Sequence, residues 1–249
     1  MSKLNIMTWN VDWFRNGRRS GSGDKSSYYY IDDCSEEICN SIISVIKEFL
    51  SKENAVVFLQ EVPYYDKKGI LHDLWNVFCR AFPEDDYALI YNKKVARKCT
   101  IAITKKDLFE DAKCFKTENR IIGVKNNDVE IVGVHMPTNF EEKDHDDEMW
   151  KNIIKYAENS KDNLILVGDF NAYIGCNIKL TEKRYLELLK FMGNCVSENI
   201  STFLNNSIDK IMLKKGDYYR NCSYQIIPQL ENKYSDHKYL TIELELGSK

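Results

Sequence analysis

The sequence lacks the features that would place the chain in a membrane or send it through one. No apolar stretch approaches the roughly 20 residues that a membrane-spanning helix needs. The first ten residues, MSKLNIMTWN, contain no apolar core of the kind that signal peptides have. We therefore expect a cytoplasmic protein without membrane insertion.

Cysteine is present, but not in the patterns that bind zinc or form a disulfide framework. The eight cysteines are scattered, and no two of them form a C-x-x-C pair. Several, such as Cys79 in LWNVFCRAF, have apolar neighbours and are typical of buried thiols. In a reducing compartment we expect all eight to be reduced.

Neither sign of charge dominates, and signals for a linker are missing. The 35 Lys and Arg residues against 38 Asp and Glu give a net charge of −3. This balance excludes a general attraction to nucleic acid, so any such binding must use local basic segments. With four prolines, eleven glycines and no Pro- or Gly-rich run at mid-chain, we expect residues 1–249 to form a single domain.

Apolar runs predict more strands than helices. The predicted strands cover residues 3–9, 55–60, 87–91, 99–104, 119–125, 129–135, 164–168, 207–213, 223–228 and 238–246. One helix is predicted to begin at a capping box formed by Asp33 and Glu36 and to end near Leu50. The others are predicted at 145–159 and 182–192, with a shorter amphipathic piece at 71–82. Short turns between many strands favour an α/β or α+β sandwich of mixed, mainly antiparallel sheets with helices outside.

One stretch, NLILVGDFNAYIG at 163–175, places polar residues directly after an apolar run. Gly168, Asp169 and Asn171 suit a chain reversal. They also suit a reaction centre, because strand ends in layered α/β proteins open onto the ligand crevice. On this stretch alone, both interpretations stand.

Further residues drawn from Asp, Glu, Asn and His end a predicted strand, interrupt one, as Asp209 does, or lie just before the final strand, as Asp236 and His237 do. These further residues are Asn10, Glu61, His135, Asp209, Asp236 and His237. Any one of them could be a cap, a turn or a surface residue. Together they favour a reaction centre.

The segments TWN, LQE, VHMP, GDFN, SIDKI and SDH occur in this order between Asn10 and His237. In this order they resemble the motifs of the endonuclease/exonuclease/phosphatase superfamily, which includes deoxyribonuclease I-like enzymes. The resemblance implies a four-layer sandwich, in which two mixed sheets lie between helices. It also implies a metal-dependent hydrolase that cleaves phosphoester bonds by in-line attack of an activated water.

The resemblance implies a metal site of hard oxygen ligands. Glu61 matches the glutamate of the family's QE motif, and Asn10 and Asp236 would complete the shell around metal and phosphate. Oxygen ligands without a thiolate cluster favour Mg²⁺ or Mn²⁺ over zinc.

The same resemblance assigns the catalytic roles. Asp169 matches the aspartate that activates water, and Asn171 would donate to a phosphate oxygen. His237 would meet the phosphoryl group, with Asp209 on its other ring nitrogen. His135 would stabilise or protonate the leaving oxygen.

A basic, tyrosine-rich stretch at 15–30 supplies candidate substrate-binding residues, namely Arg15, Arg18 and Arg19. Two further basic segments, at 91–98 and 214–220, follow strands and could reach the same face. A nucleic-acid substrate is the leading prediction, because such segments can bind phosphates and stack on bases. Solvated loops with surplus charge remain open as an alternative.

Three functions therefore remain open. They are a nuclease or nucleic-acid end-processing enzyme, a phosphatase of small molecules or lipid headgroups, and an inactive interaction module. We expect a monomer, and the sequence predicts no particular protein partner.

Overall fold

The computed structural model describes residues 3–15, 34–65, 69–93, 96, 98–109, 111–114, 119–126, 128–137, 144–161, 163–196, 199–203, 205–217, 219, 222–228 and 234–246. The helices in this part of the chain are η1 (Asp12–Phe14, a 3₁₀ turn), α1 (Glu36–Leu50), α2 (Asp73–Ala81), α3 (Asp144–Asn159) and α4 (Lys179–Leu188). The strands are β1 (Lys3–Asn10), β2 (Ala55–Pro63), β3 (Tyr87–Tyr91), β4 (Lys98–Lys105), β5 (Asp111–Cys114), β6 (Ile121–Lys125), β7 (Glu130–His135), β8 (Leu164–Asp169), β9 (Met192–Asn194), β10 (Asp209–Lys214), β11 (Ser223–Pro228) and β12 (Leu240–Glu245).

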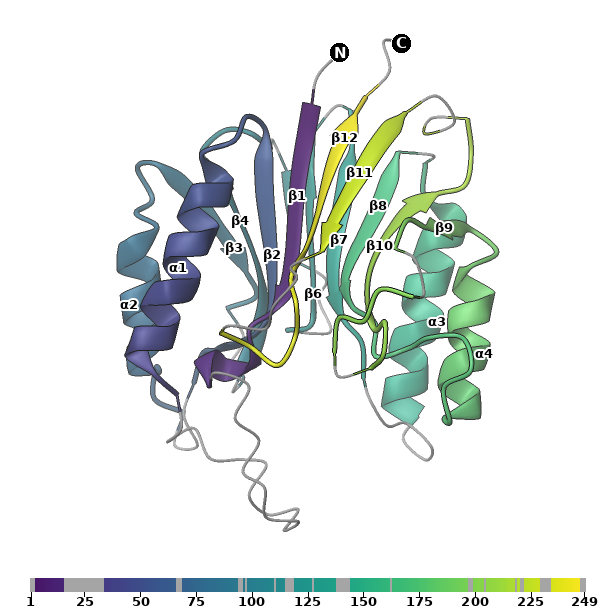
Figure 1. Cartoon of the computed structure of the whole chain (residues 1–249), viewed down its shortest axis with the longest axis horizontal. Coiled ribbons are helices and arrows are strands. Elements are labelled where there is room, and N and C mark those ends of the chain that lie inside the picture. Colours follow the sequence, from purple (N-terminus) through teal and green to yellow (C-terminus); the bar gives the residue numbers. More distant parts are fainter. Residues whose placement is uncertain are drawn as a thin grey trace.

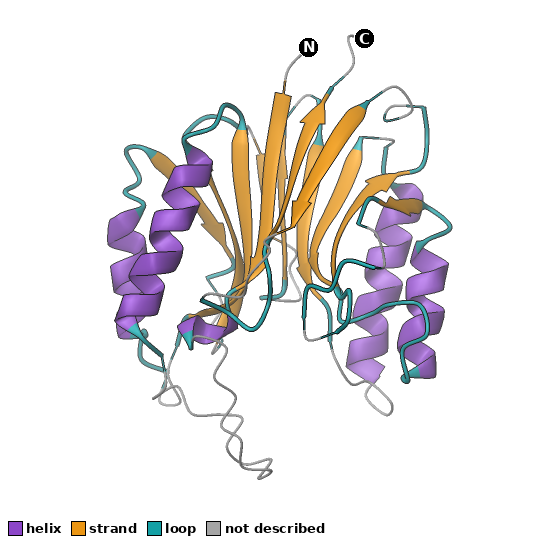
Figure 2. Ribbon diagram, in the orientation of Figure 1, coloured by secondary structure: helices purple, strands orange, loops and turns teal. Residues whose placement is uncertain are grey.

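The strands form two six-stranded sheets that face each other (Figure 1). Their strand orders are β11-β12-β1-β2-β4-β3 and β5-β6-β7-β8-β10-β9. Helices α1 and α2 cover the outer face of the first sheet, and α3 and α4 cover the outer face of the second (Figure 2). This is the predicted four-layer sandwich of mixed, mainly antiparallel sheets, which the structure confirms.

Three apolar clusters hold these layers together. The cluster between the sheets joins side chains such as Ile6 and Phe58 from one sheet to Ile165 and Ile211 from the other. Gly133 of β7 makes room for the Phe58 ring, since a Cβ there would lie 2.2 Å from a ring carbon. The two outer clusters seal the helices onto the sheets. Both central strands of each sheet are therefore buried on both faces, which explains their continuous apolar runs.

The predicted helix at 182–192 is displaced in the structure. Helix α4 ends at Leu188, and Met192 belongs instead to β9, where it pairs with Lys214 of β10. Tyr185, Leu188 and Met192 are all buried in the same cluster. The apolar spacing therefore identified the buried side chains correctly, but the chain turns into a strand before the last of them.

Two smaller details also differ from the sequence prediction. The N-cap of α1 is Ser35, whose hydroxyl accepts a hydrogen bond from the Ile38 N–H at 3.3 Å. Asp33 of the predicted capping box lies outside the described residues. The edge strands β5 and β9 were not predicted.

Parallel pairing and a β-bulge aim the strand ends at one edge of the sandwich. Strand β1 is parallel to β2, and β7 is parallel to β8. The register of β2 against β4 shifts between Leu59 and Val62, and Glu61 within this bulge has a φ of 59°. Such bulges re-aim a side chain at a strand end. In the described part of the chain, no helix is both long and apolar enough to cross a membrane.

Candidate active site

The strand ends bring the polar residues of the two sheets together at this edge. Asp169, at the end of β8, lies opposite His135 of parallel β7 and opposite Asp209 of antiparallel β10. Asn10, at the end of β1 in the other sheet, donates a hydrogen bond from Nδ2 to Asp169 Oδ2 at 3.0 Å. His135 Nε2 lies 3.3 Å from Oε1 of Glu61, which also belongs to the first sheet. The site is therefore built between the sheets.

Asp169 is almost completely buried and is held by its neighbours. Its Oδ1 accepts the backbone N–H of Asn171 at 2.9 Å, and the Asn171 side chain donates to the Met136 carbonyl at 2.8 Å. Burial and the charge of Asp209 raise the pKa of Asp169 to about 7. A carboxyl group with such a pKa can both take up and release a proton near neutral pH.

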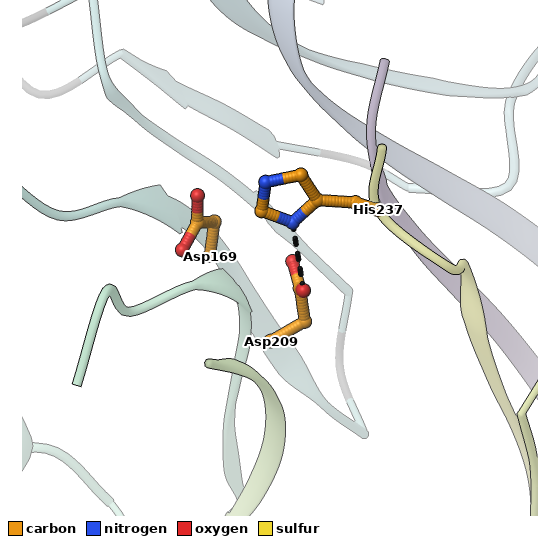
Figure 3. A group of neighbouring side chains, drawn as sticks. All are labelled: Asp169, Asp209 and His237. Carbon is orange, nitrogen blue, oxygen red and sulfur yellow. Dashed lines mark hydrogen bonds and ion pairs between the residues drawn. The ribbon is translucent and has the colours of Figure 1, made fainter. Parts of the chain in front are cut away.

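His237 forms a buried ion pair with Asp209, as Figure 3 shows. His237 Nδ1 lies 2.9 Å from Asp209 Oδ2. Burial alone would lower the pKa of His237, but the charge and hydrogen bond of Asp209, together with Asp169, raise it to about 10. The imidazole is therefore protonated at neutral pH, and Nδ1 donates to Asp209.

Backbone and ring contacts hold the His237 loop against the first sheet. Ser235 Oγ donates to the Asn10 carbonyl at 2.6 Å and accepts the His237 N–H at 3.1 Å. Trp9 Nε1 donates to the His237 carbonyl at 3.1 Å. The Phe203 ring covers the imidazole, with centroids 4.5 Å apart. His237 is thus positioned by both β1 and the β10 side of the site.

Glu61 lies between two nitrogen groups. Lys98 Nζ is 2.6 Å from Glu61 Oε1, and His135 Nε2 approaches the same oxygen. Burial would raise the pKa of Glu61, but the Lys98 charge holds it well below its usual value. Burial and Lys98 lower the pKa of His135 well below its ordinary value, so this imidazole is neutral.

Asp12 is a site residue that sequence reasoning missed. It is 6% exposed, and burial together with the charge of Asp236 raises its pKa to about 6, with a further contribution from Glu61. Arg15 donates to both the carboxylate and the carbonyl of Asp12. The signal was present, because Asp12 follows Asn10 by two positions in TWNVD. Asp12, Glu61 and Asp236 thus lie near enough for Asp12 to feel the charge of both others, and we call them the acidic group.

Several site residues have a strained backbone. Asp12, Glu61 and Asn171 have φ values of 42°, 59° and 50°, in the left-handed region that side chains other than glycine rarely adopt. Such strain persists only where the surroundings over-determine it, and it clusters at functional sites. Gly168, just before Asp169, has a φ of 135° and approaches the Val134 carbonyl so closely that a Cβ would lie 2.0 Å from its oxygen.

The site has features that suit a cation. Asp169, Asp209 and His237 each offer one ligand atom, and these atoms lie within 4.8 Å of one another. Asp209 Oδ1 is buried and has no hydrogen-bond partner among the described residues. Burial, together with the charges of Asp236 and Glu61, raises the pKa of Asp12, and Arg15 only partly offsets this effect. The carboxylate oxygens at this edge of the sandwich are hard donors of the kind that bind a divalent cation.

Of the basic segments, two have a described residue at the site and one has a described residue far from it. Arg15 lies beside Asp12, and Lys98 of the 91–98 segment reaches Glu61. Lys214 begins the 214–220 segment at the opposite end of β10 from Asp209, and its Nζ donates to carbonyls at the end of α3. The expectation that this segment reaches the site is therefore wrong for Lys214, because the strand carries it away from Asp209. Arg18 and Arg19 lie outside the described residues.

Comparison with solved structures confirms the fold. An AP endonuclease from Archaeoglobus fulgidus aligns with a TM-score of 0.68 and 16% identity, over 98% of this chain and 100% of that one. A humanized D. rerio TDP2 aligns with a TM-score of 0.65 and 14% identity, over 98% and 100% of the two chains. A 3' phosphatase, NExo from Neisseria bound to product DNA hairpin, gives 0.63 and 14%, over 98% and 100%.

The layered fold and the carboxylate and imidazole groups at its edge are those of a phosphoester hydrolase. The model of the Endonuclease/Exonuclease/phosphatase family matches residues 7–237, nearly the whole chain. The chain therefore belongs to this family, whose members are nucleases and phosphatases. A search of the curated proteins found no significant match.

Proposed function

We propose that this chain is a divalent-metal-dependent phosphodiesterase that acts on nucleic acid, and that its residues form a single catalytic domain. The observation that carries the proposal is the contact between the two sheets at the site. Asn10 from one sheet bonds to Asp169 of the other, and the His237–Asp209 pair lies beside them. Neither sheet alone contains all of these site residues.

Among the described side chains, Asp169, Asp209 and His237 bring their ligand atoms within 4.8 Å of one another. We nevertheless propose that the metal is held by the acidic group of Asp12, Glu61 and Asp236, whose charges interact. His237 is protonated and its Nδ1 bonds to Asp209, so the Asp169–Asp209–His237 group can offer a ring nitrogen only after the imidazole loses a proton. Mg²⁺ and Mn²⁺ also prefer oxygen ligands. When bound, the metal would neutralise charge on the phosphoryl oxygens.

Asn10 then has an orienting role. Its Oδ1 accepts the Asp12 N–H at 3.1 Å, while its Nδ2 donates to Asp169. The carboxamide is thereby occupied at both ends. Asn10 fixes the positions of Asp12 and Asp169 relative to each other, and we propose this in place of direct metal coordination.

Asp169 is the proposed general base. Its Oδ2 points between Asn10 and His135, and its raised pKa suits the acceptance of a proton from an attacking water. His237 supplies a positive charge for the phosphoryl oxygens through Nε2, since Nδ1 is bound to Asp209. Asn171 holds the backbone around Asp169 through its bond to Met136.

His135 is proposed to stabilise the leaving oxygen by donating a hydrogen bond. Its lowered pKa makes it a neutral imidazole, which has one N–H to donate and no spare proton to give at neutral pH. Of the two roles that the resemblance left open, stabilisation is therefore favoured over protonation.

The nucleic-acid substrate is supported by the fold neighbours, which include a structure bound to product DNA hairpin. Arg15, Arg18 and Arg19 are proposed to bind phosphates of the substrate backbone. Arg15 also balances the charge of Asp12, so its loss should affect the site as well as substrate binding.

A substrate panel tests the proposal. Purified protein with Mg²⁺ or Mn²⁺ is assayed against single- and double-stranded DNA, RNA and a set of phosphomonoesters. We expect metal-dependent cleavage of an oligonucleotide. Cleavage of phosphomonoesters alone would favour the small-molecule phosphatase, and no hydrolysis of any substrate would favour the inactive interaction module.

Calorimetric titration with Mn²⁺ tests the metal site separately. Glu61→Gln should lose most of the Mn²⁺ binding and keep its fold, because an amide oxygen carries no charge to balance the metal. Unchanged Mn²⁺ affinity in the folded variant would remove Glu61 from the site.

A further inference from the structure

We propose that Lys98 is a built-in counter-charge that holds the Glu61 carboxylate until a divalent cation binds there, and that it then contacts a phosphate oxygen of the substrate. This inference rests on the proposed metal-dependent function. It assigns a residue outside the sequence motifs to metal and substrate binding.

The placement of Lys98 depends on strand register. Lys98 is the first residue of β4 and pairs with Pro63 of β2, two residues beyond Glu61. The bulge in β2 and the left-handed backbone at Glu61 turn the Glu61 side chain toward Lys98. Their contact, 2.6 Å between Nζ and Oε1, is thus set by the local fold and not by chance proximity along the chain.

The Lys98 ammonium forms an ion pair with the Glu61 carboxylate, which is also a proposed metal ligand. Glu61 Oε1 faces both Lys98 and His135, while Glu61 also contributes to the raised pKa of Asp12. A divalent cation shared by Glu61 and Asp12 would lie close to the Lys98 charge and repel it. Metal binding should therefore move the ammonium off Oε1.

The Lys98 side chain is partly exposed and can change position, and a contact with Trp13 favours a position near the site. Its side chain is 29% exposed, whereas the His237 side chain is 7% exposed and tied to Asp209. The Lys98 ammonium also lies 5.6 Å from the centroid of the Trp13 ring, a favourable position for a cation. A lysine released from Glu61 can stay beside Trp13, next to the site, where its three N–H donors can meet a phosphate oxygen.

Three variants separate charge from structure. Lys98→Met removes the charge and keeps a similar stem, and Lys98→Arg keeps the charge. Lys105→Met is the matched control, because Lys105 is an exposed lysine at the other end of the same strand. Melting temperatures establish that each variant is folded.

The first measurement is the Kd for Mn²⁺ by calorimetry at pH 8. We expect Lys98→Met to bind Mn²⁺ about tenfold more tightly than wild type, because one competing positive charge is gone. Lys98→Arg and Lys105→Met should bind as wild type does. The proposal would be overturned if Lys98→Met bound Mn²⁺ no more tightly than wild type. It would also be overturned if Lys98→Arg bound Mn²⁺ as tightly as Lys98→Met.

The second measurement is the hydrolysis of bis(4-nitrophenyl) phosphate at saturating Mn²⁺. Lys98→Met should raise KM about tenfold or more, the effect expected from losing one charged hydrogen bond. An unchanged KM would contradict the phosphate contact. If the wild type fails to bind Mn²⁺, the proposed function fails; if it binds but Lys98→Met matches it, only this inference fails.

Discussion

The His237 imidazole carries its charge because of one carboxylate. Asp209 is 1% exposed, and only one of its oxygens has a hydrogen-bond partner among the described residues, namely the His237 ring. In a buried pair of this kind each charge stabilises the other, since either charge without its partner would be costly in the interior. The proton on His237 thus depends on Asp209.

Removing the Asp209 charge should discharge His237. In Asp209→Asn the pKa of His237 should fall from about 10 toward its ordinary value of about 6.5, because burial is then opposed only by the charges of Asp169 and Asp236. NMR titration of the histidine ring resonances in metal-free protein measures this. Asp85→Asn, at an exposed aspartate, is the control and should leave the titration unchanged. A His237 that still titrates near pH 10 in Asp209→Asn would contradict the assignment.

Asp12 illustrates the opposite case, a charge that the metal-free fold tolerates at a cost. Its folded pKa of about 6 is above the usual value, so the neutral carboxyl is favoured in the folded state. The stability linked to this group is fully present below about pH 4 and is lost as pH rises through 6. A carboxylate whose ionised form destabilises the metal-free fold is expected at a site that binds a cation.

Asp12→Asn should therefore stabilise the metal-free protein at pH 8 and weaken metal binding. The gain over wild type should appear between pH 4 and 6 and reach roughly 3 kcal/mol, since the pKa rises from 3.8 to about 6 and one pKa unit corresponds to about 1.4 kcal/mol. Urea unfolding in the presence of EDTA, at pH 4 and pH 8, measures it. A variant that is less stable than wild type at pH 8 would show that the Asp12 charge is well compensated without metal.

The backbone at the end of β8 requires glycine at position 168, because no residue with a Cβ fits there. Gly168 has a φ of 135° and lies against the backbone of β7, and Asp169 follows it directly. The close contact of the two parallel strands at this point places Asp169 opposite His135. Any Cβ at 168 must push the strands apart.

Gly168→Ala should destabilise the protein by several kcal/mol, because backbone strain and overpacking each cost about 1–3 kcal/mol. Gly193→Ala is the matched control, since its Cβ would meet the nearest atom at an ordinary 3.7 Å. Chemical denaturation of the two variants measures the difference. Equal stability of both would mean that β7 and β8 can separate freely at this point.

Strand and helix prediction succeeded where the apolar pattern was long and failed where it was short. All ten predicted strands are present with boundaries close to those expected, but the edge strands β5 and β9 have only four and three residues. A period cannot be recognised in so few residues. Met192 shows a related limit, because apolar spacing identifies a buried side chain without identifying its element.

The site could be predicted only in part, for a similar reason. Residues that directly follow apolar runs, such as Asp169 and His135, are visible in the sequence as polar groups at strand ends. Asp12 was missed because it lies in a left-handed turn after the strand. Lys98 was predicted only as part of the basic segment 91–98, because its contact with Glu61 requires the cross-strand register and a bulge, and no sequence pattern reveals either.

The two sheets contribute different chemistry to one site. The first supplies Asp12 and Glu61 for the proposed metal, and the second supplies Asp169 and the Asp209 partner of His237. The apolar cluster between the sheets keeps these groups in register. The family match over residues 7–237 accordingly includes the site residues of both sheets.

The central claim is that Asp169 acts as the base in metal-dependent phosphodiester hydrolysis. Its most direct test compares wild type with Asp169→Asn in the cleavage of a labelled oligonucleotide, with Mn²⁺ and with EDTA. We predict cleavage by wild type only with the metal, and a kcat for folded Asp169→Asn that is lower by about 10²–10⁴. Near-native cleavage by Asp169→Asn, or undiminished wild-type cleavage in EDTA, would contradict the account.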